Sequence, residues 1–155
     1  MAGLSLPFIL RDHDSTHGPH VLDATECWER VRESGVGRLA FVVENWPVVL
    51  PVNFCTDGDD VVLRSGEGLK LSTLRRSPAV ALEVDSFEPL YRSGWSVLLL
   101  GTASVVDDPD ESGRLDALGL RPWAASERAS WLRVHPLQIT GRRLARAWRY
   151  PDLPI

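Results

Sequence analysis

The first half of the chain contains two runs in which apolar side chains recur with a period of two, and this pattern restricts the fold more than any other. The runs cover 38–43 and 48–54, and a third run, which is apolar over its first three residues, follows at 61–65. A period of two places one set of side chains on one face of a β-strand. The turns between the runs, at 45–46 and 57–59, contain Asn, Asp or Gly and are short enough for hairpins. The sequence therefore predicts a three-stranded antiparallel meander.

Three further strands are expected downstream, over 80–84, 95–106 and 131–142. The run over 95–106 is the longest strand candidate. Gly101 in its middle marks a bulge or a close approach of another backbone. Pro136 interrupts the last run.

A few short helices complete the prediction. Asp23 and Glu26 form a capping box for a helix that ends before Ser34. Shorter helices are expected over 71–76 and from the acidic stretch at 107 to about 118. Six strands with hairpin-length connections predict a mainly β protein built as a six-stranded antiparallel barrel, because closure removes exposed strand edges.

Composition fits one soluble globular domain with a core of its own. The chain has 155 residues, of which 44% are hydrophobic, and a formal net charge of −4. Proteins that bind nucleic acid usually present a basic face, so the mild acidity disfavours that class. We expect an extended N-terminal arm over 1–20, one domain over 21–146 and a C-terminal tail over 147–155.

The sequence predicts a cytoplasmic protein. No signal-peptide pattern is recognisable at the start of the chain. The densest apolar run, 97–100, is far shorter than the ~20 residues that a bilayer span needs. Cys27 and Cys55 lack a paired spacing, so we expect free thiols that pack as small apolar side chains.

The segment from 61 to 71 carries the strongest functional signal. It ends a strand with Arg64 and Ser65, passes through two glycines and brings Lys70, the only lysine of the chain, to the start of a helix. A guanidinium, a hydroxyl, an ammonium and the amides of a helix N-terminus are groups that bind a phosphate monoester. An ordinary strand-turn-helix with solvated charges fits the pattern equally well. The spacing of a nucleotide triphosphate loop is missing.

Two other segments indicate a planar polar ligand. Pro51 cannot donate to a sheet ladder, so its strand is expected at an edge with unpaired backbone groups, and Asn53 adds an amide. Trp95 and Ser96 open the long strand, where an indole and a hydroxyl can flank an aromatic ring and bond its edge. The alternatives are a bulge with a solvent-facing Asn, and plain packing of the tryptophan.

Other constellations give weaker signals. The expected arm contains four residues that can ligate a metal: His13, Asp14, His17 and His20. No regular element fixes their geometry, so a metal site is not favoured there. Asp57, Asp59 and Asp60 lack the calcium-loop pattern and are interpreted as turn residues. His135 lies on a strand with no evident nucleophile, which leaves a hydrolase triad unsupported.

Seven segments carry a family resemblance through their order and spacing: VGRLA (36–40), PVNF (51–54), RSGEGLKL (64–71), EVD (83–85), SGWSV (93–97), RPW (121–123) and ITGR (139–142). With them, the chain from about residue 26 to 143 resembles the pyridoxamine 5'-phosphate oxidase-like, FMN-binding split-barrel family, in particular its small bacterial members. The match covers about three quarters of the chain.

The resemblance implies a homodimer of six-stranded antiparallel split β-barrels, with FMN sites built across the subunit interface. Carried over by position, the phosphate ligands are Arg64, Ser65 and Lys70. The remaining flavin contacts implied by the family are Pro51, Val52, Asn53, Leu71, Trp95 and Ser96, with Arg142 contributed by the partner subunit.

One departure from the family concerns the substrate. In the pyridoxamine-phosphate oxidases proper, a C-terminal Arg followed two residues later by a His grips the substrate phosphate. Here 141–146 reads GRRLAR without a His, which argues against vitamin B6 oxidation. The leading hypothesis is an FMN-dependent oxidoreductase acting on a small molecule of unknown identity. The alternatives are a deazaflavin-dependent reductase, a non-catalytic flavin carrier or sensor, and an interaction domain with a degenerate site.

Overall fold

The computed structural model describes residues 20–66, 69–90, 93–121, 123 and 129–144. The expected N-terminal arm, apart from His20, and the expected C-terminal tail lie outside these residues. The strands found within them are β1 (His20–Leu22), β2 (Val36–Val43), β3 (Trp46–Asn53), β4 (Cys55–Asp57), β5 (Asp60–Gly66), β6 (Ala79–Glu88), β7 (Ser93–Val105) and β8 (Ala129–Leu144). The helices are α1 (Ala24–Glu33), α2 (Leu69–Arg76) and α3 (Pro109–Asp116).

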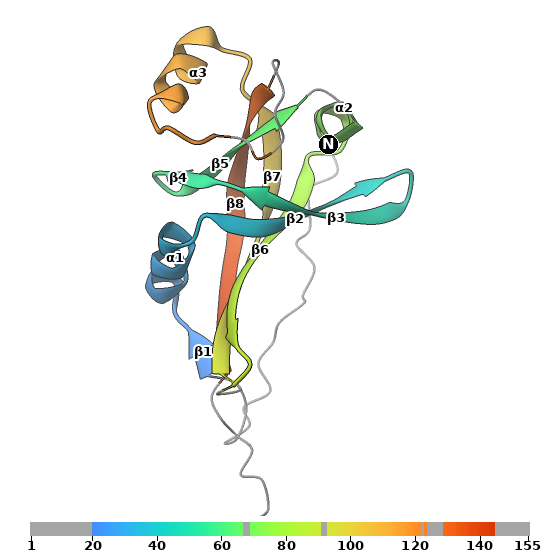
Figure 1. Ribbon diagram of the computed structural model, residues 1–155. Helices are drawn as coiled ribbons and strands as arrows, with labels where there is room; N and C mark the ends of the chain where they lie inside the picture. Colours follow the sequence, from blue (N-terminus) through green and yellow to red (C-terminus); the bar gives the residue numbers. More distant parts are fainter. Residues whose placement is uncertain (1–19, 67–68, 91–92, 122, 124–128, 145–155) are drawn as a thin grey trace, which may run out of the picture.

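The described strands form one antiparallel sheet in the order β3-β2-β6-β7-β8-β5-β4, with β1 beside β8. Its two ends, β3 and β4, are joined in sequence by the single residue Phe54, so the sheet curls until its ends meet (Figure 1). Phe54 is buried, and its N–H donates to the carbonyl of Gly35 at 3.0 Å. Because no ladder joins β3 to β4 or β5 among the described residues, the fold is a split antiparallel barrel.

The pair formed by β7 and β8 runs the length of the molecule (Figure 1). Its register shifts between Leu100 and Gly101, which leaves Leu137 of β8 as a bulge residue beside Pro136. Proline has no N–H to give to a ladder, so a bulge at this point costs the sheet little. A Cβ at Gly101 would collide with the main chain of His135. Both sequence-based interpretations of Gly101, a bulge and a close backbone approach, are confirmed.

The main core fills the inside of the curled sheet. Leu39, Leu82, Leu99 and Leu132 come from four different strands, and each is fully buried. Leu74 of α2 is buried with them, so α2 packs on the same core. Burial of a leucine side chain stabilises a fold by about 1.5–3 kcal/mol, which makes this cluster the main source of stability.

A smaller core lies on the opposite face of the sheet, under α3. It consists of Val62, Leu115 and the ring of Trp131, and the indole N–H donates to Asp116 at 2.8 Å. The β2–β3 hairpin projects from the body of the barrel (Figure 1), and Trp46, the first residue of β3 at the tip of this hairpin, is 76% exposed.

The helices begin and end close to where the sequence predicts. The capping box of α1 is present: Glu26 N–H donates to the Asp23 carboxylate at 2.8 Å, and Asp23 N–H donates to the Glu26 carboxylate at 3.1 Å. Helix α2 begins two residues before the expected position. Helix α3 has Pro109 in its first turn behind the cap of Asp108, and ends at Asp116.

Three expectations about the strands are wrong. The described sheet has eight strands instead of six, because β1 and β4 have three residues each and are too short to show a period. The meander does not form, since Phe54 redirects the chain and β5 pairs with β8. The longest described strand is β8, with 16 residues against 13 in β7. It extends the expected strand over 131–142 by two residues at each end.

Other expectations concern single residues and segments. Cys27 and Cys55 are free thiols, and burial raises the pKa of both. Three of the four metal-ligand candidates of the arm lie outside the described residues. Within the described residues, no group of three or more His, Cys, Asp or Glu side chains is arranged to hold a metal ion. None of the helices in the described ranges combines the length and the apolar composition that crossing a bilayer requires.

Candidate functional site

The expected phosphate-binding segment forms the junction between β5 and α2. Strand β5 ends at Gly66, and Lys70 is the second residue of α2. Residues 67–68 and the Lys70 side chain lie outside the described part of the chain. Leu71 packs against the main core. The first turn of α2 contains no acidic residue, so none of its own side chains offsets the positive end of the helix dipole.

Arg64 and Ser65 are neighbours on β5 and therefore point to opposite faces of the sheet. The Arg64 guanidinium donates to the carbonyl of Ala129 at 3.1 Å, lies 3.4 Å from Asp116 and lies over the ring of Trp131. Its Nε is buried and has no hydrogen-bond partner among the described residues. Ser65 is buried on the core face and donates to the next carbonyl along the chain.

Strand β3 lies at an edge of the sheet, as Pro51 predicts, and pairs only with β2 in the described part. Val52 is buried, whereas Pro51 and Asn53 point to the outer face. The Asn53 amide donates to the carbonyl of Arg121 at 2.6 Å. Arg121 belongs to the connection between α3 and β8, whereas Ala129, which Arg64 contacts, is the first residue of β8. Asn53 therefore contacts this connection, and Arg64 contacts the start of the strand that follows it.

Trp95 and Ser96 start β7 and pair with Arg143 and Arg142 at the end of β8. Trp95 is half-buried against the main core, and the guanidinium of Arg30 lies 5.7 Å from its ring centroid. Ser96 and Arg142 are therefore cross-strand neighbours on one face of the sheet.

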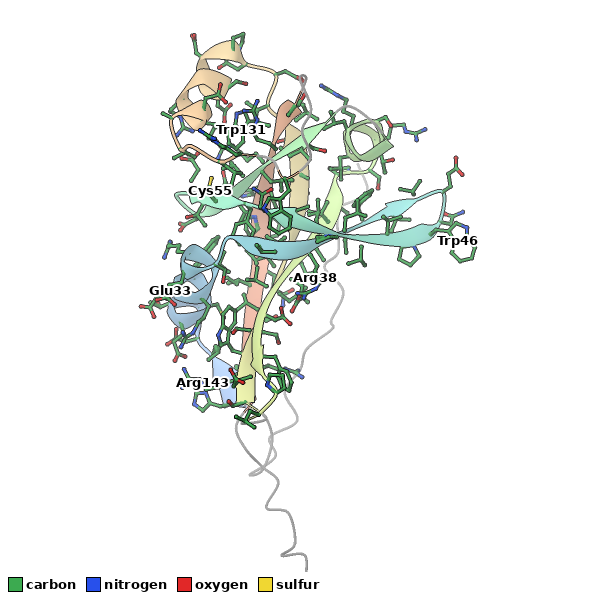
Figure 2. All side chains as sticks on the ribbon, viewed as in Figure 1. Glu33, Arg38, Trp46, Cys55, Trp131 and Arg143 are labelled. Atoms are coloured by element: carbon green, nitrogen blue, oxygen red, sulfur yellow. The ribbon has the colours of Figure 1, made fainter. Side chains whose placement is uncertain are left out.

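These two groups of predicted site residues lie at opposite ends of β8. Arg64 pairs with Trp131, whereas Ser96 pairs with Arg142. Figure 2 shows Trp131 near α3 and Arg143 near β1, at the two ends of the molecule. The distance along the strand from Trp131 to Arg142 is about 36 Å at about 3.3 Å per residue. A flavin mononucleotide is shorter than this, so one chain cannot bring both groups to a single flavin.

A cluster of three charges that was not predicted is centred on Arg38 of β2, which is labelled near the middle of Figure 2. Arg38 is paired across the strands with Pro51 on one side and Glu83 on the other. Its guanidinium donates to Glu83 at 3.0 Å and to Asp85 at 2.6 Å. Burial, followed by the charge of Asp85, raises the pKa of Glu83, and Arg38 opposes this shift. No spacing in the sequence indicates the cluster, because strand register assembles it.

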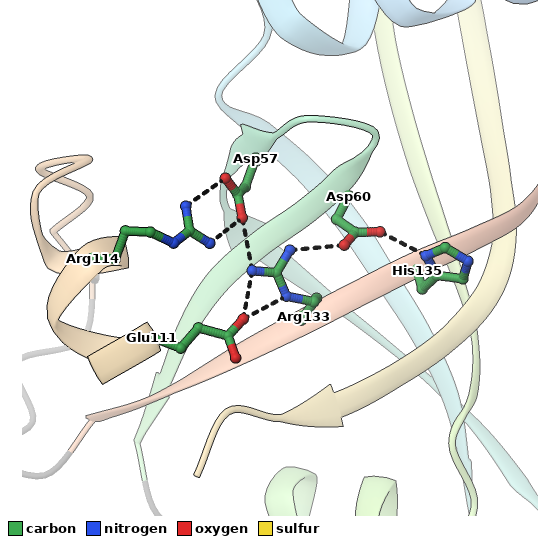
Figure 3. A network of polar contacts seen from close by, with 6 residues as sticks. All are labelled: Asp57, Asp60, Glu111, Arg114, Arg133 and His135. Carbon is green, nitrogen blue, oxygen red and sulfur yellow. Dashed lines mark hydrogen bonds and ion pairs between the residues drawn. The ribbon is translucent and has the colours of Figure 1, made fainter. Parts of the chain in front are cut away.

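A second unpredicted network ties α3 and the β4–β5 hairpin to β8 (Figure 3), and its members are Asp57, Asp60, Glu111, Arg114, Arg133 and His135. Arg133 donates to Asp57, Asp60 and Glu111, each at 2.7 Å. Arg114 adds two bonds to Asp57, at 2.7 and 2.9 Å. Asp57 and Asp60, interpreted from the sequence as turn residues, are therefore members of this network. They are far from Arg133 in the sequence, and the pairing of β5 with β8 is what brings them together.

The network around Arg133 should make the free energy of unfolding depend on pH in the acid range. Hydrogen bonds from Arg114, then from Arg133, hold the pKa of Asp57 far below its ordinary value. A carboxyl whose pKa is lower in the folded state stabilises the fold above its unfolded pKa, and this contribution is lost as the pH falls. We expect the urea midpoint to fall between about pH 5 and pH 3. Asp57→Asn should flatten this dependence, and an unchanged slope would contradict the role of Asp57.

Comparison with known proteins decides the family. The family model described as pyridoxamine 5'-phosphate oxidase matches residues 23–143 of this chain. The chain belongs to this family. The match confirms the resemblance seen in the sequence and agrees with the split-barrel fold. The match shows the family and not a substrate, and residues 141–146 of this member read GRRLAR, without a histidine.

Three similar proteins show the level of likeness within the pyridoxamine 5'-phosphate oxidase family. The uncharacterised Mycobacterium tuberculosis protein Rv0080 is 32% identical over 135 residues, covering 84% of this chain and 88% of that protein. A Mycobacterium smegmatis structure described as an FAD binding protein is 34% identical, with a TM-score of 0.69 over 82% of this chain and 99% of that one. A Corynebacterium diphtheriae protein of unknown function is 32% identical, with a TM-score of 0.71 over 81% and 98%.

Proposed function

We propose that this protein binds FMN and acts as a flavin-dependent oxidoreductase on a small-molecule substrate. The observation that carries the proposal is Arg64, whose buried Nε has no partner among the described residues and which stands just ahead of α2. An N–H of a guanidinium and the amides of a helix N-terminus are ligands for a phosphate monoester. The FAD-binding relative from Mycobacterium smegmatis supports the flavin class.

The residues present fit a flavin phosphate. A bound flavin supplies hydride transfer, while the protein binds and orients it. Arg64 and Lys70 would hold the phosphate, with Arg64 giving up its 3.4 Å contact to Asp116. The Asn53 amide and the unpaired edge of β3 offer hydrogen-bonding groups to a planar ring. No side chain is assigned as a proton donor or acceptor.

The proposal includes a second copy of the chain. Because Arg64 and Arg142 lie at opposite ends of β8, a site that uses both needs Arg64 from one copy and Arg142 from the other. The outer face supports such a contact, since Val42 of β2 and Val49 of the edge strand β3 are exposed there at 49% and 59%. Exposed apolar side chains that gather at the edge of a sheet are typical of surfaces that another chain covers.

Titration of the cofactor-stripped protein with FMN, followed by visible absorbance, tests the proposal. A hydrogen bond to a charged group contributes about 1.5–3 kcal/mol, so Arg64→Ala should weaken FMN binding about 10- to 100-fold. Arg142→Ala should weaken it as well, while the exposed Arg76→Ala is the matched control and should bind like the unmodified protein. Circular dichroism checks that each variant folds, and FAD and a deazaflavin are titrated in parallel. Failure to take up FMN would overturn the proposal.

A mixture of the Arg64→Ala and Arg142→Ala variants, each expected to bind FMN weakly by itself, tests whether two copies share the site. After subunit exchange, half of the pairs contain one chain of each kind, and each mixed pair holds one undamaged site. About a quarter of all sites should then bind FMN with the original affinity. A mixture as weak as either variant alone would contradict a site shared between two copies. Reduction of the bound flavin by NADH or NADPH separates an oxidoreductase from a carrier.

A further inference from the structure

A hollow of about 170 Å³ opens between α1 and β8. Trp28 of α1, Asp59 of the turn between β4 and β5, and residues 135–139 of β8 line it. None of these residues belongs to the proposed flavin site. The hollow is therefore a separate feature, and binding there is independent of the proposed function.

The hollow lies where β8 has a strand partner on one side only. Within the described residues, β8 pairs with β5 as far as Val134 and with β1 from Gly141 onward. Residues 135–140 lie between these two partners; apart from the bulge residue Leu137, they pair with β7 and with no other described strand. The bulge at Leu137 and the missing N–H of Pro136 also interrupt the ladder here. Main chain and apolar side chains thus form a floor that no neighbouring strand covers.

His135 is held in one orientation at this hollow (Figure 3). Its Nδ1 lies 2.7 Å from one carboxylate oxygen of Asp60, and the other oxygen accepts from Arg133 at 2.7 Å. Because a carboxylate can only accept, the proton of the neutral ring belongs on Nδ1. Nε2 is then left as an acceptor, on a side chain that is 65% exposed.

The other groups at the hollow define what it can bind. Asp59 is a second acceptor at the rim, paired with Arg32 at 3.2 Å, and the same guanidinium lies 5.2 Å from the centre of the Trp28 ring. Trp28, Leu137 and neighbouring apolar atoms form the walls. The volume is close to that of a cavity of about 150 Å³ that holds benzene. An aromatic ring with a donor on its edge matches this combination of size, apolar walls and acceptors.

We propose that the hollow between α1 and β8 binds a small aromatic molecule carrying an N–H or O–H donor. The ring packs against Trp28 and Leu137, and the donor bonds to Nε2 of His135. Asp60 and Arg133 act as positioning residues, because they hold the imidazole with its acceptor turned away from the network.

Indole and 1-methylindole are a matched pair of probes, since methylation replaces the N–H donor with a methyl group, and His135→Ala separates the lost hydrogen bond from the added bulk. We expect indole to shift the backbone amide signals of Leu137, Gln138 and Ile139 in NMR spectra of the 15N-labelled protein. A single hydrogen bond contributes about 0.5–1.5 kcal/mol, so indole should bind about three- to tenfold more tightly than 1-methylindole. His135→Ala should abolish this preference, and His135→Gln, which keeps an acceptor, should restore part of it. His20→Ala, which removes an exposed histidine from β1, is the control.

Three results would each overturn the proposal. Indole could leave the amide signals of 137–139 unchanged, 1-methylindole could bind as tightly as indole, or His135→Ala could keep the preference. The FMN titration is read separately from the NMR signals of β8, so failure of one proposal is distinguishable from failure of the other.

Discussion

Arg133→Met is expected to lower the free energy of unfolding by about 3 kcal/mol. The substitution keeps an apolar stem of similar length but removes the donors that Asp57, Asp60 and Glu111 share. Their side chains are 20%, 21% and 34% exposed, so they would be left partly buried without a compensating cation. Breaking a buried ion pair costs about 3–5 kcal/mol, and the residual exposure places this case at the lower end. Urea denaturation at neutral pH measures the effect.

Arg75→Met is the matched control for Arg133→Met. Arg75 also makes two short bonds to a carboxylate, Asp107, but both side chains are more than half exposed. Exposed ion pairs contribute about 0–1 kcal/mol, so the control should lose no more than that. Arg133→Lys should fall between the two, because an ammonium keeps the charge without the planar set of donors. Equal losses for Arg133→Met and Arg75→Met would show that the network is an ordinary surface feature.

Gly101→Ala is expected to destabilise the protein by about 2–3 kcal/mol, although it adds only one methyl group. The added Cβ would lie 2.9 Å from the carbonyl carbon of His135 and from Cα of Pro136, and closer still to the His135 oxygen. These are main-chain atoms of β8, so no side-chain rotation can make room. The register shift of the β7–β8 ladder lies at this point, and the change should also disturb the bulge at Leu137.

Gly113→Ala is the control for the effect of adding a methyl group. Gly113 lies in α3, and a Cβ there would meet nothing within 4 Å. Alanine is favoured over glycine inside a helix by about 0.5–1 kcal/mol, so this variant should be slightly more stable. In thermal and urea denaturation, the free energy of unfolding should fall for Gly101→Ala and rise slightly for Gly113→Ala. A neutral Gly101→Ala would mean that β7 and β8 can separate at little cost.

Much of the secondary structure could be predicted from the sequence alone. Apolar side chains at every second position indicate that one face of a strand is buried. The Asp23–Glu26 capping box indicates a helix start, where backbone amides need hydrogen-bond partners. Both signals are local, so they need no knowledge of the fold. Pro51 indicates an edge strand because it has no N–H for a ladder, and Gly101 indicates a close approach because it has no side chain, so both signals are local as well.

The arrangement of the candidate site could not be predicted in this way. The segments around 51, 64, 95 and 142 indicated a flavin site, and they remain predictions. Their positions at the two ends of β8 depend on which strands pair, and the Arg38 and Arg133 clusters depend on register. Residues that meet across these pairs of strands are separated by dozens of positions in the chain, and the pattern within one strand does not indicate which other strand pairs with it.

The sequence by itself determined the family, the mainly β class, the first helix with its cap and most strand positions. Only the tertiary structure decided that β3 and β4 meet at Phe54 without a ladder and that β5 pairs with β8. It also placed Arg64 and Arg142 at separate ends and left a hollow beside His135. The physical reason is that side-chain periodicity records which face of a segment is buried, whereas strand order and register result from packing the whole core.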